Sequence, residues 1–261
     1  MKERTAEVVA QSKEIEGQKG RIEDLLLNIL PKEISEELKD KGKATARRHE
    51  KVTVLFTDMK GFTQAAEKMT PEELVNELDE CFIRFDEIVG HYGIEKIKTI
   101  GDSYMCAAGV PTSDPFHAHK CILAALEVRD LMDDWRRERE AQGKTPWILR
   151  IGVHSGPVVA GVVGKRKFAY DIWGDTVNTA SRMESSGAPG EVNISGATYE
   201  LIKDRFECES RGQIAAKNKG AIDMYFVRRI KPAYSADEQG TRPNDTFRRE
   251  VGSPLAAEQV A

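Results

Sequence analysis

The chain has 261 residues, and its 39 Lys and Arg side chains against 43 Asp and Glu side chains give a formal net charge of −4. This length accommodates one large domain, or one medium domain with appendages. The near balance of charge excludes a nucleic-acid-binding protein that works through bulk positive charge. A polyanionic ligand would therefore be held by a few local cations or by a metal ion.

Cysteine usage and hydropathy limit the compartment. The four cysteines form no CxxC pair, which indicates reduced thiols rather than a disulfide framework or a zinc site. No stretch of about 18 apolar residues occurs, and the charged first 30 residues contain no signal-peptide core. We therefore expect a cytoplasmic location, either as a soluble domain or as the cytosolic part of a membrane-anchored protein.

Residues 1–41 have a helical pattern. Apolar residues recur every seven positions at Val8, Ile15, Ile22 and Ile29, with Leu25 close to the same stripe. This repeat predicts a coiled-coil seam, although the glutamines and glycines in its upper half also allow a solvated amphipathic helix. Pro31 ends the pattern, a second short helix is expected over 33–39, and a polar linker covers 42–50.

Residues 51–230 carry the apolar patterns of a folded domain. A buried strand is predicted over 52–56 and a helix over 71–91, which begins at the capping box of Thr70 and Glu73. Two strands over 94–100 and 104–108 form a hairpin, and a long helix follows over 116–137.

The second half of this domain continues with short elements. A second hairpin is predicted over 148–163 about a Ser-Gly-Pro turn, followed by a strand over 168–173 and a helix over 176–184. A last hairpin joins 206–211 to 224–228. The order strand, helix, hairpin, helix, strand predicts an α+β fold with a ferredoxin-like βαββαβ core. Residues 231–261 are polar, and we expect a disordered C-terminal tail.

Two aspartates are candidate metal ligands. Asp58 follows the first strand, and Asp102 lies at the tip of the first hairpin. Alone, each is typical of a cap or a turn. In a ferredoxin-like core, however, that strand and that hairpin are neighbours, so both carboxylates fall at the same end of the sheet. Such a pair indicates two metal ions and phosphoryl transfer. The backbone amides of Gly61, Phe62 and Thr63 would add an anion site at a helix start.

Several other polar residues are candidates for substrate contacts. Asn178 and Arg182 are four residues apart on a predicted helix and face the same way, which suits charge developing on a phosphate or sugar oxygen. Lys217 lies in a turn, where it can either meet terminal phosphates or be simply solvated. Lys98 and Asp171 each interrupt an apolar strand, and a donor with an acceptor at such positions can recognise a base edge.

Three segments together carry a resemblance to a known family. Residues 56–63 (FTDMKGFT), 96–104 (KIKTIGDSY) and 170–182 (YDIWGDTVNTASR) occur in the order and separation of a class III nucleotidyl cyclase catalytic domain. The resemblance covers about residues 50–230. It implies a lyase that converts a nucleoside triphosphate to a 3′,5′-cyclic nucleotide and pyrophosphate with two Mg²⁺ or Mn²⁺ ions.

The resemblance also implies roles for individual residues. Asp58 and Asp102 match the metal-binding aspartates of the family, together with the carbonyl of Met59. Lys98 and Asp171 match the pair that recognises adenine. The remaining matches are the ribose-orienting Asn178, the transition-state arginine Arg182 and the phosphate-binding Lys217.

The adenine pair can be argued physically. Adenine presents an NH₂ donor to Asp171 and a ring acceptor to Lys98, whereas guanine reverses both. Guanylate cyclases carry Glu and Cys at these two positions. The resemblance therefore implies an adenylate cyclase that makes cyclic AMP from ATP in signal transduction.

The family resemblance extends to assembly. Its active sites form between two chains, and this chain carries both complementary sets of residues, so a head-to-tail homodimer with two shared sites is expected. Residues 1–41 are similar to the signalling helix and transducer element of such cyclases, with an upstream sensor or membrane domain implied. Nucleic acid is not an expected partner.

Three alternatives remain. A guanylate cyclase is disfavoured by Lys98 and Asp171. A diguanylate cyclase would need a Gly-Gly-(Asp/Glu)-Glu-Phe signature, which is absent. A catalytically silent dimerisation module would be expected to lack a metal-binding aspartate or the arginine, and none of these is missing.

Overall fold

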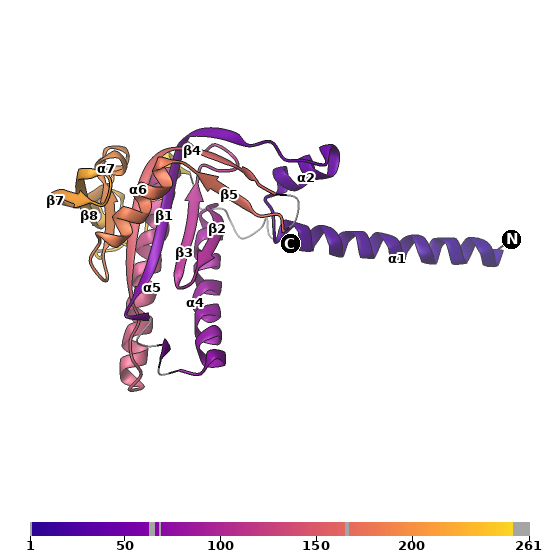
Figure 1. Cartoon of the computed structure of the whole chain (residues 1–261), viewed down its shortest axis with the longest axis horizontal. Coiled ribbons are helices and arrows are strands. Elements are labelled where there is room, and N and C mark those ends of the chain that lie inside the picture. Colours follow the sequence, from indigo (N-terminus) through magenta and orange to yellow (C-terminus); the bar gives the residue numbers. More distant parts are fainter. Residues whose placement is uncertain (1, 63–65, 68, 165–166, 253–261) are drawn as a thin grey trace. The chain divides into compact units, whose positions relative to one another are not determined.

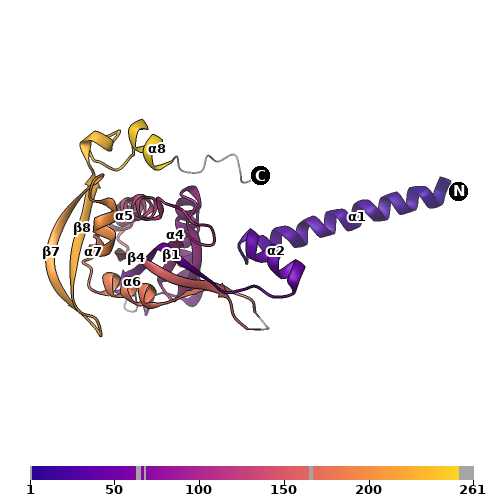
Figure 2. The same ribbon diagram turned by 90° about the horizontal axis from the view of Figure 1, so that it is seen from above.

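The computed structural model describes residues 2–62, 66–67, 69–164 and 167–252. The chain divides into two compact units (Figures 1 and 2). Unit 1 consists of residues 1–47 and 160–171, and unit 2 of residues 48–159 and 172–261. The candidate Thr63 lies outside the described residues.

Unit 1 contains the two predicted N-terminal helices, α1 (Lys2–Leu27) and α2 (Lys32–Lys41). Helix α2 ends at Gly42, which has a φ of 68° and donates its N–H to the carbonyl of Leu38, so a residue without a Cβ is favoured there. Within α2, the buried carboxylate of Glu37 accepts hydrogen bonds from Thr45 at 3.0 Å and from Arg47 at 2.7 Å. Glu37 thereby fixes the segment that leads out of α2.

One mixed sheet forms the centre of the fold. Its strands are β1 (Arg47–Lys60), β2 (Glu95–Ile100), β3 (Ser103–Ala108), β4 (Ile148–Val162), β5 (Tyr170–Trp173), β6 (Val192–Ser195), β7 (Phe206–Ala216) and β8 (Gly220–Ile230). The order is β2-β3-β1-β4-β6-β8-β7, with β5 paired to β4. The order β2-β3-β1-β4 is that of the predicted βαββαβ core, so the predicted fold class is confirmed.

Two long helices, α4 (Pro71–His91) and α5 (His117–Ala141), cover the main core of unit 2. The predicted capping box begins α4: Glu73 donates its N–H to the Thr70 hydroxyl at 3.2 Å, and Thr70 donates its N–H to the Glu73 carboxylate at 2.8 Å. Side chains such as Phe85 and Leu126 are buried between these helices and the sheet. None of the described helices combines the length and the apolar character that a membrane crossing requires.

Two shorter helices complete the domain, α6 (Asp175–Ser185) and α7 (Gly196–Ile202). Met183 of α6 packs in a separate small cluster with Ala216 and Met224. The four cysteines are free, in agreement with the predicted reduced thiols.

The predicted hairpin over 148–163 is wrong. β4 runs as one strand through Gly156 and Pro157. Gly156 serves close packing rather than a turn, because a Cβ there would lie 2.6 Å from the hydroxyl oxygen of Thr176. That hydroxyl donates to the carbonyl of Pro157 at 2.6 Å, so α6 begins directly against the strand.

The C-terminal segment also differs from the expectation of a disordered tail over 231–261. A 3-10 turn, η1 (Pro232–Tyr234), and a helix, α8 (Asp245–Val251), form within it. Asn244 caps α8 by accepting the N–H of Phe247 at 3.0 Å. Phe247 and Val251 are buried in the main core, and two apolar side chains in a polar segment suffice to dock it.

Candidate active site

The two candidate metal-binding carboxylates converge at one end of the sheet. β1 pairs with β3 in antiparallel register, with Phe56 opposite Met105, so Asp58 reaches the turn that carries Asp102. The Asp102 carboxylate accepts the N–H of Met59 at 3.2 Å, and Ser103 donates its hydroxyl to Asp58 at 3.4 Å. Burial raises the pKa of Asp102, and the negative charge of Asp58 adds to this effect. The expected convergence of both acids is confirmed.

An arginine that the sequence analysis did not single out lies against these acids. Arg150 of β4 forms an ion pair with Asp58, with 2.5 Å between Nη2 and Oδ2. Its Nε lies 2.9 Å from Oε1 of Glu184 on α6. The guanidinium therefore bridges one candidate metal ligand and a second carboxylate.

Glu184 is held in place by unusually close backbone packing. A Cβ at Gly152 of β4 would lie 1.8 Å from the backbone nitrogen of Glu184, so only glycine lets α6 approach the strand so closely. Asn193 donates its amide to the carbonyl of Met183 at 2.7 Å and fixes the same end of the helix. Burial raises the pKa of Glu184 to about 7, and the charge of Arg150 opposes this shift.

Asn178 and Arg182 lie on α6 as predicted. The helix buries the side that includes Ala180 and Met183, whereas Asn178 is exposed and Arg182 is half-buried. Both polar side chains are thus available on a helix whose opposite side is fixed against the sheet.

Lys217 is exposed in the turn between β7 and β8. Its neighbour Lys219 forms an ion pair with Asp175, the first residue of α6. This contact places the turn beside the start of the helix that carries Asn178 and Arg182. Lys219 is thereby engaged, and Lys217 is the lysine of this turn that faces solvent.

The two base-recognition candidates lie on separate strands. Lys98 is exposed on the edge strand β2, opposite Met105, where the register shifts between Lys96 and Lys98. Asp171 is half-buried in β5 and belongs to unit 1, whereas the other described candidates belong to unit 2. Exposure on an edge strand removes the cost of a charge at Lys98.

The backbone bends after the carboxylate of Asp58. Gly61, with a φ of 78°, directly follows the end of β1, and Phe62 packs edge-on against Trp147 with 5.8 Å between the ring centroids. Of the three residues whose amides are predicted to bind an anion, the structure describes Gly61 and Phe62.

The donor set at the sheet end fits a hard divalent cation. Two carboxylates and the nearby Met59 carbonyl are the oxygen ligands that Mg²⁺ and Mn²⁺ prefer. Among the described residues, no group of three or more His, Cys, Asp or Glu side chains is arranged to hold a metal ion. Mg²⁺ sites in proteins usually keep several water ligands and add substrate phosphates to one or two carboxylates.

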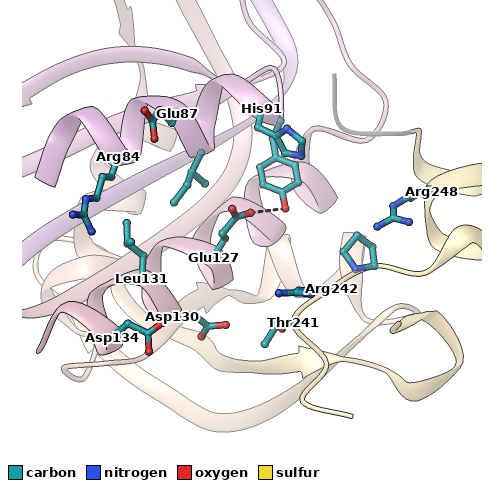
Figure 3. Close-up of a pocket in the computed structure, with 13 residues that line it drawn as sticks. Arg84, Glu87, His91, Glu127, Asp130, Leu131, Asp134, Thr241, Arg242 and Arg248 are labelled. Atoms are coloured by element: carbon teal, nitrogen blue, oxygen red, sulfur yellow. Dashed lines mark hydrogen bonds between the residues drawn. The ribbon is translucent and has the colours of Figure 1, made fainter. Parts of the chain in front are cut away.

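A separate cavity of about 730 Å³ lies between α4, α5 and the C-terminal segment (Figure 3). Tyr92 and Glu127 both line it, and Tyr92 donates its hydroxyl to the Glu127 carboxylate at 2.8 Å. Arg242 and Arg248 enter from the C-terminal segment, opposite acidic side chains of α5. None of the candidate catalytic residues lines this cavity.

Comparison with known proteins agrees with this geometry. The family of adenylate and guanylate cyclase catalytic domains matches residues 44–229. The chain belongs to this family. The match contains all the predicted metal- and nucleotide-binding residues.

Relatives of this cyclase domain include enzymes of both base specificities. An adenylate cyclase of Mycobacterium tuberculosis is 40% identical over 231 residues, which are 88% of this chain and 51% of the relative. Human guanylyl cyclase C is also 40% identical, over 219 residues that are 82% of this chain and 20% of the relative. The chain thus spans about half, or less, of the length of these relatives.

A solved cyclase structure has the same architecture. The adenylyl cyclase CyaB from P. aeruginosa matches with a TM-score of 0.66 and 34% identity, covering 70% of this chain and 95% of that one.

Arg150 and Glu184 are the residues of this cyclase domain that sequence reasoning missed. Arg150 alternates with the buried Leu149 and Ile151 along β4, and Glu184 follows Ala180 by four residues on the buried side of α6. The sequence signal that could have identified both residues is a charged residue within an apolar pattern, because a buried charge needs a partner of opposite charge.

Proposed function

We propose that this protein is an adenylate cyclase that converts ATP to 3′,5′-cyclic AMP and pyrophosphate in signal transduction. The convergence of Asp58 and Asp102 at one end of the sheet carries the proposal. Membership in the cyclase family supports a cyclisation reaction, and the residue types at positions 98 and 171 support adenine as the base.

Asp58, Asp102 and the carbonyl of Met59 would hold the divalent cations. When bound, these cations supply positive charge to the ribose 3′-oxygen and to the triphosphate. Arg150, 2.5 Å from Asp58, adds a positive charge beside the same carboxylate. Lys217 and the amides of Gly61, Phe62 and Thr63 would contact phosphate oxygens.

The reaction is intramolecular. The ribose 3′-oxygen attacks the α-phosphorus, the bond from that phosphorus to the bridging oxygen breaks, and pyrophosphate leaves with the bonding electrons. The proton of the 3′-hydroxyl passes to solvent or to a phosphate oxygen. Asn178 orients the ribose, and Arg182 compensates the charge that develops as the bond to pyrophosphate breaks.

We propose a head-to-tail homodimer as the active state. The metal-binding acids lie on β1 and the β2–β3 turn, whereas Asn178 and Arg182 lie on α6. Twofold symmetry would set the acids of one chain against α6 of its partner, twice per dimer.

Base choice follows from complementary hydrogen bonding. Asp171 accepts from the adenine NH₂ group, and Lys98 donates to the ring nitrogen. Guanine would set an acceptor against Asp171 and a donor against Lys98, and each polar group left unpaired once the base covers it would cost about 1–3 kcal/mol. The 40% identity to human guanylyl cyclase C makes a guanylate cyclase the second candidate.

A parallel product assay tests the proposal. The protein is incubated with ATP or GTP, first with Mg²⁺ and then with Mn²⁺, and the cyclic nucleotides are separated by chromatography. We expect cyclic AMP as the main product, with Asp58→Asn as an inactive control. Cyclic GMP as the main product would instead establish the guanylate cyclase, and no product with either metal would favour a silent module.

A further inference from the structure

Three charged side chains from three different elements form one row in unit 2. Asp58 comes from β1, Arg150 from β4 and Glu184 from α6. Arg150 Nη2 lies 2.5 Å from Asp58, and Arg150 Nε lies 2.9 Å from Glu184. The proposed function accounts for Asp58 and gives Arg150 a charge next to the phosphates, but it leaves the third member of the row without a role.

Glu184 is the most deeply buried member. Its side chain is 11% exposed, against 27% for Arg150 and 26% for Asp58. A buried carboxylate is costly unless a cation compensates it, and burial accordingly raises its pKa. Arg150 is the cation in contact with it, so the two groups depend on each other.

The position of Glu184 is set by the backbone rather than by its own side chain. The contact of Gly152 with the nitrogen of Glu184 leaves no room for α6 to shift toward β4. One end of the guanidinium is thus anchored to a fixed point, and the other end reaches Asp58.

Asp58 cannot hold the guanidinium and a divalent cation on the same oxygen. Two positive charges at one carboxylate oxygen repel each other strongly at such short distances. Arg150 Nη2 contacts Oδ2 of Asp58, so a metal ion that binds through this oxygen has to displace the guanidinium. An arginine anchored elsewhere gives way more easily than one whose only carboxylate is Asp58.

We propose that Glu184 is a positioning residue that holds Arg150 beside the metal-binding carboxylates, where Arg150 competes with a divalent cation for Asp58. The inference rests on the proposed function, because it takes Asp58 to be a metal ligand. Glu184 keeps the displaced guanidinium next to the site, where the phosphates of a nucleotide arrive.

The competition is measured without nucleotide, by titrating the full chain with Mn²⁺ and monitoring the free ion by electron paramagnetic resonance. Arg150→Gln removes the competing cation, and we expect Mn²⁺ to bind at least threefold more tightly. Glu184→Gln leaves Arg150 with Asp58 alone, and we expect binding at least threefold weaker. In the Arg150→Gln background, Glu184→Gln should change the affinity less than twofold.

Controls separate this role from general damage. Glu207→Gln breaks another Arg–Glu pair, with Arg229 at 2.7 Å on the β7–β8 hairpin, and should leave Mn²⁺ affinity unchanged. Thermal unfolding checks that each variant is folded. If Glu184 had only a structural role, Glu184→Gln would lower the unfolding temperature. Its effect on Mn²⁺ affinity would then be the same with and without Arg150.

Two results would overturn the inference. In the first, Asp58→Asn weakens Mn²⁺ binding but the affinity is the same with and without Arg150. This result overturns the present inference and leaves the proposed function standing. Mn²⁺ affinity that does not depend on Asp58 overturns both the competition and the metal assignment in the proposed function.

Discussion

His119 is buried where α5 meets the C-terminal segment. Its ring packs against the rings of Phe116 and Phe247, with centroids 5.9 and 6.3 Å apart. Burial, together with the positive charge of Arg205, lowers the pKa of His119 to about 4, and the negative charges of Asp204 and Asp114 oppose the shift. The neutral ring is therefore a condition for this packing.

This shift predicts an acid-sensitive fold. Between pH 6.5 and 4 the unfolded chain binds more protons than the folded one. The contribution of neutral His119 to the free energy of unfolding is therefore fully present above pH 6.5 and is lost as the pH falls toward 4. From pH 7.5 to 5, His119 should account for about 2 kcal/mol of lost unfolding free energy. Urea unfolding at both pH values should show a smaller loss for His119→Gln than for the unmodified protein.

The exposed His91 provides the matched control, since its ring lies outside the buried packing around His119. His91→Gln should keep the full pH dependence. An unchanged pH dependence in His119→Gln would contradict the assignment. His154, whose pKa is also lowered to about 4 by burial, supplies a second contribution that both variants retain.

At the residue scale, short motifs were enough to predict that Asp58 and Asp102 lie close together. Asp58 and Asp102 were placed correctly because strand and hairpin patterns fix their neighbourhood. His119 was not singled out by the sequence analysis, although His117 and His119 are both buried on α5. Their burial depends on α8 and on distant strands, which no local periodicity encodes.

At the element scale, the contact of α6 with β4 positions much of the candidate site. Helix α6 carries Asn178 and Arg182 on its accessible side and Glu184 on its packed side. The sequence predicted the helix but placed a hairpin turn at Gly156 in β4, since Ser-Gly-Pro is typical of turns. A glycine required by a neighbouring helix looks the same in sequence as a glycine required by a turn.

Gly152→Ala tests this contact. The added Cβ would meet the backbone of Glu184 at 1.8 Å, so the helix has to shift. We expect a loss of about 2–3 kcal/mol in unfolding free energy, typical of overpacking, and a fall in kcat as Arg182 moves. Gly90→Ala in α4 is the control, because a Cβ there has nothing within 4 Å. It should leave activity unchanged and stability equal or slightly higher. Full activity of Gly152→Ala would show that the packing of α6 does not set the site.

At the scale of the whole molecule, one feature of unit 1 points to a partner. Ile15 and Ile22 of the heptad repeat are both 65% exposed on α1 in the single chain, and Ile29, just beyond the end of α1, is 62% exposed. A parallel coiled coil with a second copy would cover this stripe. It would also raise the effective concentration of one catalytic domain near the other, as a shared active site requires.

Complementation between two inactive variants tests the shared site. Asp58→Ala removes a proposed metal ligand, and Arg182→Ala removes the arginine proposed to stabilise the transition state, so each homodimer should be inactive. In a mixed dimer one site loses both groups, whereas the other keeps Asp58 from one chain and Arg182 from its partner. Random pairing makes half of the dimers mixed, with one intact site of two, so co-expressed chains should regain about a quarter of the original activity.

The control is a mixture of Asp58→Ala with Asp102→Ala. Both substitutions affect the same half of the site, so every mixed dimer has one damaged acid in each site and should stay inactive. Recovery in the first mixture but not in the second requires acids and arginine to come from different chains. If neither mixture regains activity, each chain forms its active site alone. In that case dilution should not reduce the specific activity of the unmodified protein, whereas a shared site loses activity once the dimer dissociates.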